Sequence, residues 1–305
     1  MRFGECVLNG HTLGMTDLDL DDSWRRLEWV HELVDRIGPA VAAIDLQARK
    51  GALNFDTRVL GEFEHARYTL AGALEVPPDL GFVISDIAVN ARSCLDMAIT
   101  SIAAAYKLPI KNPQFPIENN IEVRQEDRTR QLMEALPADF RDVLTELQPN
   151  YNTPWGYVDR PVNWTALMIR AISNANKHRN LTPVTRTPGS RGMTLVDGLD
   201  VEMLSPADAS PWPDDDATVL EVRYPIGAAS DKQLAQMRPH RNVRLMIHQT
   251  GFKYDWLDLE FPVAASEFLD LTPKYVHHAL TVFEQTHQHI QAPGSGFFRN
   301  FNKSL

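Results

Sequence analysis

Cysteine is nearly absent from this chain, which has Cys6 and Cys94 among 305 residues and no C-x-x-C spacing. The sequence therefore favours neither a disulfide framework nor a cysteine-ligated metal site, and a reducing compartment fits it best. Basic residues are too few to balance the acidic ones: 30 Lys and Arg against 40 Asp and Glu give a net charge of −10. This charge provides no general attraction to nucleic acid or to an anionic membrane.

Long apolar runs are also missing, since no segment approaches the ~18 residues of a membrane span. The N-terminal sequence MRFGECVLNGHTLGMTDLDLDD becomes acidic where a signal peptide would be apolar. We therefore expect a soluble cytoplasmic protein that makes no membrane contact.

The chain lacks the common catalytic and cofactor motifs. G-x-S-x-G, the Walker loop, G-x-G-x-x-G and H-E-x-x-H do not occur. Three Glu-x-x-His spacings occur, at Glu28/His31, Glu62/His65 and Glu284/His287. A carboxylate-bridged metal bundle also needs inward Glu residues on other helices, and segments 79–106 and 161–178 contain none. We expect neither a metal site nor a cofactor.

Apolar residues recur at helical spacing over much of the first part of the chain and again near its end. The first such segment has Asp21 and Asp22 at its start and Gly38-Pro39 at its end. Pro137 and Thr272-Pro273 are typical of helix starts. The pattern predicts five to six helices, over 21–37, 79–106, 121–135, 138–147, 161–178 and 272–291.

Short alternating runs predict a hairpin over 52–76 and, after Arg179, an antiparallel sheet with one solvated face. The expected later strands are 193–196, 219–224, 243–248 and 254–261. We expect an α+β fold, in which a helical bundle carries an antiparallel sheet between its fourth or fifth helix and the C-terminal helix. One domain would span 1–291, with helices in 20–180 and 272–291 and the sheet in 185–265. Residues 205–217 would form an acidic loop, and 292–305 a flexible tail.

The most informative polar segment is SNANKHR at 173–179, at the end of a predicted amphipathic helix. Helical projection places His178 near the buried stripe and Asn174 one turn before it, while Lys177 projects towards solvent. Such a histidine suits proton transfer or ligand binding. The structural alternative, which we favour, is that Lys177, His178 and Arg179 cap the helix and complement its dipole.

A second polar set lies on the predicted central helix. Arg92 and Asp96 flank its apolar stripe, where they would form a helix-to-helix salt bridge or orient the His178 ring. Asn90, one turn after Asp86, is expected to face solvent. The last helix carries His277, His278, His287 and His289 on several faces, so these are expected to be surface residues.

Two passages resemble known families. DIAVNARSCLDMAI at 86–99, followed by FPI at 115–117, and ISNANKHRNL at 172–181 resemble a widespread group of uncharacterised bacterial and phage proteins. More remotely, the helical part is similar to the HEPN superfamily of helical bundles, many of which are ribonucleases with an Arg-Asn-x-x-x-His motif. Asn174 and His178 match this motif, whereas Ser173 replaces its Arg.

Two functional hypotheses follow. In the first, the chain is a non-catalytic interaction protein: Arg92, Asp96, Asn174 and His178 form a buried network, and the sheet or the Phe-rich tail binds a protein partner or a second copy. The second, implied by the HEPN resemblance, is a metal-independent ribonuclease or a nucleotide-binding module that uses His178. His178 would be a general acid or base on RNA, Asn174 would orient its ring, and Arg179 or Lys177 would neutralise the phosphorane. RNA is a partner only under this alternative.

Overall fold

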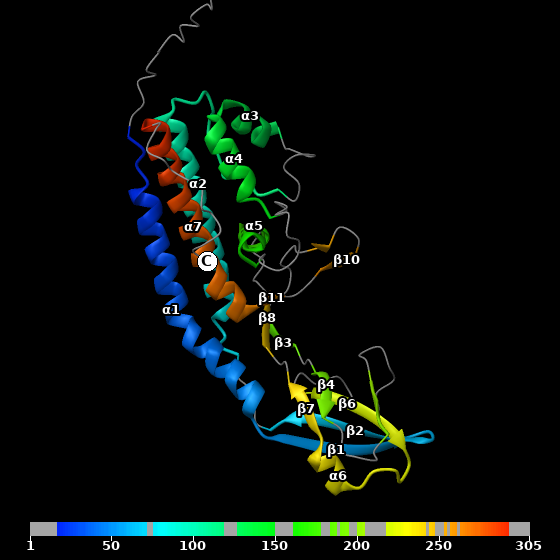
Figure 1. The fold of residues 1–305 in the computed structure, drawn as a ribbon. Coiled ribbons are helices and arrows are strands. Elements are labelled where there is room, and N and C mark those ends of the chain that lie inside the picture. The colour runs from blue at the N-terminus through cyan, green and yellow to red at the C-terminus, as the bar shows by residue number, and fades with distance from the viewer. Residues whose placement is uncertain are drawn as a thin grey trace, which may run out of the picture. The chain divides into compact units, whose positions relative to one another are not determined.

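A computed structural model describes residues 17–71, 76–118, 127–149, 161–177, 184–187, 190–194, 200–204, 218–241, 244–247, 253–254, 257–260 and 263–292. Their α+β fold comprises seven helices and eleven strands (Figure 1). The helices are α1 Asp21–Lys50, α2 Leu80–Ala105, α3 Asp127–Ala135, α4 Ala138–Glu146, α5 Pro161–Lys177, α6 Asp231–Gln236 and α7 Ala265–Gln291. The strands are β1 Leu53–Leu60, β2 Phe63–Leu70, β3 Val184–Thr187, β4 Ser190–Thr194, β5 Glu202–Met203, β6 Thr218–Pro225, β7 Arg238–Arg241, β8 Arg244–Ile247, β9 Lys253–Tyr254, β10 Leu257–Glu260 and β11 Val263–Ala264.

The chain divides into two compact units, which are described separately. Unit 1 takes its described residues from Met1–Val30, Asn90–Leu167 and Pro273–Leu305, and unit 2 from His31–Val89 and Met168–Thr272. Boundaries between the units fall within α1, α2, α5 and α7.

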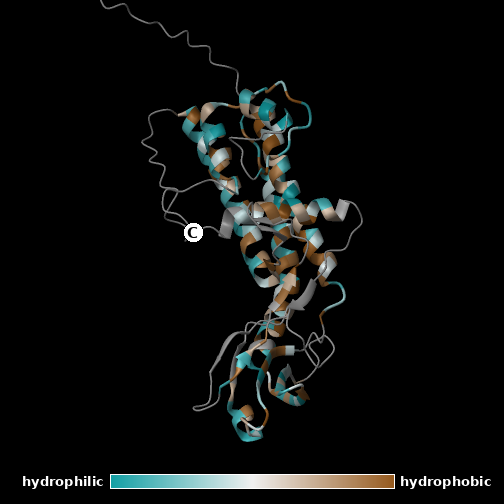
Figure 2. Cartoon of the chain, turned by 90° about the vertical axis from the view of Figure 1, so that its right-hand side faces the viewer, coloured by the Kyte–Doolittle hydropathy of each residue, from teal (hydrophilic) through white to brown (hydrophobic). Residues whose placement is uncertain are grey.

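Unit 1 is helical. Its helices are amphipathic, with teal and brown alternating along their length in Figure 2. Its core contains three aromatic side chains from separate elements: the Phe283 ring lies 6.3 Å from Phe115 and 6.2 Å from Phe140. The Tyr275 hydroxyl donates a hydrogen bond to the Leu147 carbonyl at 3.0 Å, which ties α7 to the end of α4. The core therefore joins α7 to α4 and to the proline-rich segment after α2.

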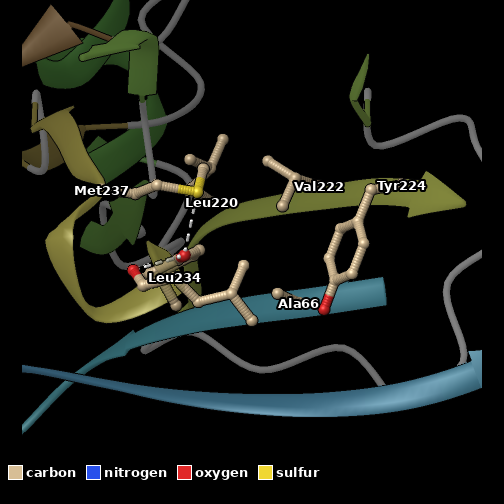
Figure 3. Close-up of a cluster of buried hydrophobic side chains, with 7 residues drawn as sticks. Ala66, Leu220, Val222, Tyr224, Leu234 and Met237 are labelled. Atoms are coloured by element: carbon tan, nitrogen blue, oxygen red, sulfur yellow. Dashed lines mark hydrogen bonds between the residues drawn. The ribbon is translucent and has the colours of Figure 1, made fainter. Parts of the chain in front are cut away.

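Unit 2 contains a four-stranded antiparallel sheet in the order β1-β2-β6-β5. One face of this sheet is apolar, and α6 and Met237 pack on it (Figure 3). The Tyr68 hydroxyl lies in this core and donates to the Leu234 carbonyl at 2.9 Å. The buried residues of this core are Ala66, Tyr68, Leu220, Val222, Tyr224, Leu234 and Met237.

Two helices are longer than the sequence predicted. The predicted end of the first helix at Gly38-Pro39 is wrong, because α1 continues to Lys50 with Pro39 in its interior. The predicted start at Thr272-Pro273 is also wrong, because α7 begins at Ala265. An interior proline costs ~3 kcal/mol. The apolar stripe continues beyond each proline, with Val41 and Ile44 in α1 and Phe268 and Leu269 in α7 all buried, and this burial offsets the cost.

The extension of α1 places a buried carboxylate in unit 2. Asp45 is 3% exposed, and it accepts a hydrogen bond from Ser266 Oγ at 3.0 Å and another from the Leu245 N–H at 3.4 Å. These contacts hold β8 and the first turn of α7 beside the last part of α1.

The predicted hairpin over 52–76 is confirmed as β1 and β2, but the predicted position of the sheet is only partly right. Two strands of the four-stranded sheet come from this early hairpin, and β6 and β5 come from the later region. The predicted strand 254–261 is wrong, since β9 and β10 are two short strands that pair with each other. Segments 205–217 and 293–305 lie outside the described residues.

Candidate functional site

The predicted site at the end of α5 is described only in part. Ser173 is buried, and its Oγ donates to the Arg170 carbonyl in the same helix at 3.1 Å. Asn174 is exposed. Lys177 is the last residue of α5, and its side chain lies outside the described residues, as do His178 and Arg179 entirely. Their role in capping or in catalysis therefore stays a prediction.

Three polar residues of α2 in unit 1, Asn90, Arg92 and Asp96, form side-chain hydrogen bonds or ion pairs. Arg92 Nε lies 3.2 Å from Asp96 Oδ2 one turn further along, so this salt bridge is within α2 and not between helices as predicted. The other carboxylate oxygen of Asp96 accepts the backbone N–H of Phe115 at 2.8 Å. Asn90, which we expected to face solvent, is half-buried and accepts a hydrogen bond from Arg26 of α1 at 3.0 Å. The Asp96–Phe115 contact therefore joins α2 to the segment that follows it, and the Asn90–Arg26 contact joins α2 to α1.

His287 of α7 is buried, which contradicts its predicted surface position. It lies one turn after Phe283 on the buried stripe. Its Nε2 accepts the Leu18 N–H at 3.3 Å and faces Gln291 Nε2 at 2.8 Å, and its Nδ1 lies 2.9 Å from the Tyr106 hydroxyl. A backbone N–H only donates, so Nε2 carries the lone pair and Nδ1–H donates to Tyr106.

Burial shifts the pKa values of both His287 and Tyr106. Desolvation lowers the pKa of His287, although the Asp17 charge opposes the shift. Desolvation also raises the pKa of Tyr106 to about 12, and Asp139 adds to this effect. Both groups are therefore neutral near pH 7, and their hydrogen bond joins α7 to the residue that follows α2.

Glu284, one turn before His287 on α7, is hydrogen-bonded to Trp24 of α1. Trp24 Nε1 donates to Glu284 Oε1 at 2.6 Å, and the Trp24 ring meets His277 edge-on at 5.2 Å. Glu284, the acidic member of the Glu284/His287 spacing, is thus hydrogen-bonded to an indole.

Within the described residues, no group of three or more His, Cys, Asp or Glu is arranged to hold a metal ion.

The second face of the four-stranded sheet in unit 2 carries rows of charged residues. One row consists of Asp56, Arg67 and Glu221, which lie opposite one another on β1, β2 and β6. Arg67 and Glu221 form a buried ion pair at 2.6 Å, with side chains 7% and 12% exposed. We predicted residues 219–224 as an alternating strand but did not predict this pair; the local signal for a polar second face was the charge at two alternate positions, Glu221 and Arg223.

The next row places Arg58, His65, Arg223 and Glu202 opposite one another. Arg223 binds Glu202 through two hydrogen bonds, of 2.7 and 2.9 Å. His65 is buried, and no described residue hydrogen-bonds its Nδ1. Its pKa is lowered mainly by desolvation and also by the Arg223 charge, while Glu221 opposes the shift. His65 is therefore neutral beside a guanidinium.

Large apolar side chains are exposed at the end of the β1–β2 hairpin. Val59, Leu60 and Phe63 flank its two-residue turn and are 60%, 44% and 38% exposed, and Ile226 directly after β6 is 57% exposed. We call Val59, Leu60, Phe63 and Ile226 the hairpin-end patch. The Arg223 guanidinium lies 5.3 Å from the Phe63 ring centroid, which places a cation beside the patch.

Comparisons with known proteins provide no further assignment. No family model matches the sequence, and neither the curated proteins nor the solved structures include a match. In the part of the chain that the structure describes, no helix has the length and apolar character needed to cross a membrane.

Proposed function

We propose that this chain is a non-catalytic protein-binding protein whose binding surface is the hairpin-end patch of unit 2. The observation that carries the proposal is the exposure of four large apolar side chains at one end of the sheet, where Leu60 and Phe63 pair on the face of the charged rows and Val59 lies on the face of the apolar core. Grouped exposed apolar side chains on a folded protein are typical of interaction sites, whereas scattered ones need no explanation.

The surroundings of the patch support this proposal. The Arg223–Glu202 pair and the Glu64 carboxylate, which accepts the Gly227 N–H at 3.2 Å, lie next to the apolar residues. An apolar centre with a polar rim is the usual composition of a protein–protein interface. The polar clusters of unit 1 instead hold elements together, as Asp96 holds Phe115 and Glu284 holds Trp24.

Photo-crosslinking tests the binding surface. A benzophenone amino acid replaces Leu60, and in a matched control it replaces Phe82, an exposed aromatic residue of α2 in the same unit. In cells that produce the full chain, irradiation is expected to yield a discrete protein adduct from position 60 and none from position 82. Ile226→Ser in the Leu60 variant is expected to weaken the adduct. No adduct at position 60, or the same adducts at both positions, would contradict the proposal.

The non-catalytic part of the proposal has its own test. Purified protein and His178→Ala are incubated with labelled mixed RNA in the presence of a chelator. We expect no cleavage by either protein. Metal-independent cleavage that disappears in His178→Ala would support the HEPN-like ribonuclease instead, with His178 as its acid or base.

A further inference from the structure

We propose that the protein partner of the four-stranded sheet is a second copy of this chain, and that the two β1 strands pair antiparallel about a two-fold axis at Thr57. This inference rests on the proposed function, because it takes the edge of the same sheet next to the hairpin-end patch, Val59 included, as part of the binding surface and names its partner. It is carried by the open edge of β1 and by the charges along that strand.

Among the described residues, β2 is the one strand that pairs with β1. β1 is the end strand of the sheet, and no described strand lies beyond it. The Ala71 N–H donates to the Ala52 carbonyl at 2.8 Å, and these residues continue the β1–β2 register. Hydrogen-bonded positions alternate along an antiparallel ladder. Even-numbered residues of β1 therefore bond to β2, and the backbone groups of Phe55, Thr57 and Val59 face the open edge.

Within the described residues, one backbone group on this edge has its partner in its own strand. The Thr57 N–H donates at 3.2 Å to Oδ1 of the preceding residue, Asp56, and thus to its own strand. The side chains of residues 56–60 are all exposed. Unpaired strand edges of this kind readily pair with another chain unless they are protected.

The sequence of β1 is complementary to itself in one register. A two-fold axis at Thr57 places Asp56 opposite Arg58 of the second copy, and Arg58 opposite the second copy's Asp56. It also places Phe55 opposite Val59, twice. Opposite charges and apolar pairs directly across two strands are stabilising. Phe55, Thr57 and Val59, whose backbone groups face the open edge, are the residues that this register uses for hydrogen bonds.

The two neighbouring registers of the β1–β1 pair place like charges opposite each other and are therefore less stable. Moving the two-fold axis to Asp56 sets two aspartates directly opposite each other, and moving it to Arg58 does the same with two arginines. Like charges at such positions are destabilising. The charges of β1 therefore select the register centred on Thr57 and favour a second copy over an unrelated strand, because only an identical strand supplies both pairs by symmetry.

This pairing continues both faces of the sheet. Phe55 and Val59 belong to the face that carries the apolar core, and they meet residues of the same face in the second copy. Val59, which is 60% exposed, would then lie against Phe55 of the second copy. The product is a continuous sheet of two four-stranded halves, in which neither β1 strand is an edge.

Sedimentation equilibrium of the full chain and its charge variants tests the inference. The wild type is expected to be a dimer in concentration-dependent exchange with monomer. Asp56→Arg and Arg58→Asp each convert both cross-strand attractions into repulsions, so each is expected to weaken dimerisation by about tenfold or more. The double variant D56R/R58D restores opposite charges and is expected to regain affinity to within about threefold of the wild type.

Two further variants complete the test. Glu62→Arg makes the same change of charge in the exposed turn and is expected to leave dimerisation unchanged. Thr57→Pro removes an N–H that faces the open edge, and is expected to abolish the dimer. Circular dichroism during heating checks that each variant is folded, and the charge variants decide the question if Thr57→Pro is not.

A wild type that stays monomeric, or a double variant no better than the single ones, would overturn the self-pairing. The crosslinking experiment separates this failure from failure of the proposed function. An adduct from position 60 to a different protein would retain protein binding and reject the second copy as the partner.

Discussion

His287 Nδ1 lies 2.9 Å from the hydroxyl of Tyr106, 181 residues earlier in the sequence. The other ring nitrogen of His287 accepts the Leu18 N–H. One neutral imidazole thus holds together the segment before α1, the residue after α2 and the last turns of α7. Protonation would convert the Nε2 acceptor into a donor that faces the donor of Leu18.

Stability is therefore expected to fall at acid pH. The pKa of His287 is lowered in the folded protein, so the unfolded chain binds more protons below the ordinary value of 6.5. The free energy of unfolding is highest above that pH and decreases as the pH falls through it, by at most ~1.4 kcal/mol per pH unit for one histidine. Urea unfolding at several pH values between 5 and 8 measures this slope.

His287→Phe is the matched variant for this measurement. It is expected to be less stable at pH 8 and to show a shallower pH dependence than the wild type. Part of the slope should persist, because burial also lowers the pKa of His65 and His278. An identical slope in the variant would show that His287 does not contribute.

Asp96→Ala is expected to destabilise the protein by ~1–3 kcal/mol, because it leaves the Phe115 N–H and the Arg92 guanidinium without this carboxylate. Asp96→Asn keeps an oxygen acceptor for the N–H and is expected to cost less. Urea unfolding at pH 7 measures both variants. Equal losses would mean that the charge of Asp96, and not its contact with Phe115, is what stabilises the segment.

Helical periodicity predicted most helices of this fold because a buried face repeats in the sequence. It failed at Pro39 and Pro273, where local rules favour a helix boundary. The burial of Val41 beyond one proline and of Phe268 before the other decided the outcome. A tertiary contribution of this kind is not visible in a short sequence window.

The sheet and the site show a similar limit. Alternation identified β1, β2 and β6 as strands, but not that β2 and β6 pair across 154 residues, as Arg67 and Glu221 do. His287 was expected at the surface because the four histidines of the last helix fall on several of its faces. Its burial depends on Tyr106 and Leu18, which lie on other elements. Pairing across long sequence separations has no local signal.

Arg67→Met is expected to destabilise the protein by ~3–5 kcal/mol, because it leaves the buried Glu221 carboxylate without its cation. Replacing both residues, Arg67→Met with Glu221→Met, removes the two charges together. This double variant is expected to be more stable than either single variant, as measured by urea unfolding. Additive losses would show that the two side chains act independently despite their 2.6 Å contact.

Gly38→Ala distinguishes a continuous α1 from a helix that ends before Pro39. A terminal glycine with positive φ would make alanine destabilising, whereas an interior glycine makes it stabilising by ~0.5–1 kcal/mol. Gly38 lies inside α1, and apart from its two chain neighbours and the backbone of its own helix, a methyl group added to it would meet no atom within 4 Å. Alanine is therefore expected to raise the melting temperature.

Gly61→Ala is the matched control with the opposite expected sign. The space around Gly61 is equally open, but its φ of +64° strains an alanine, and the substitution is expected to cost ~1 kcal/mol or more. A loss of stability in both variants would mean that α1 is interrupted at Gly38.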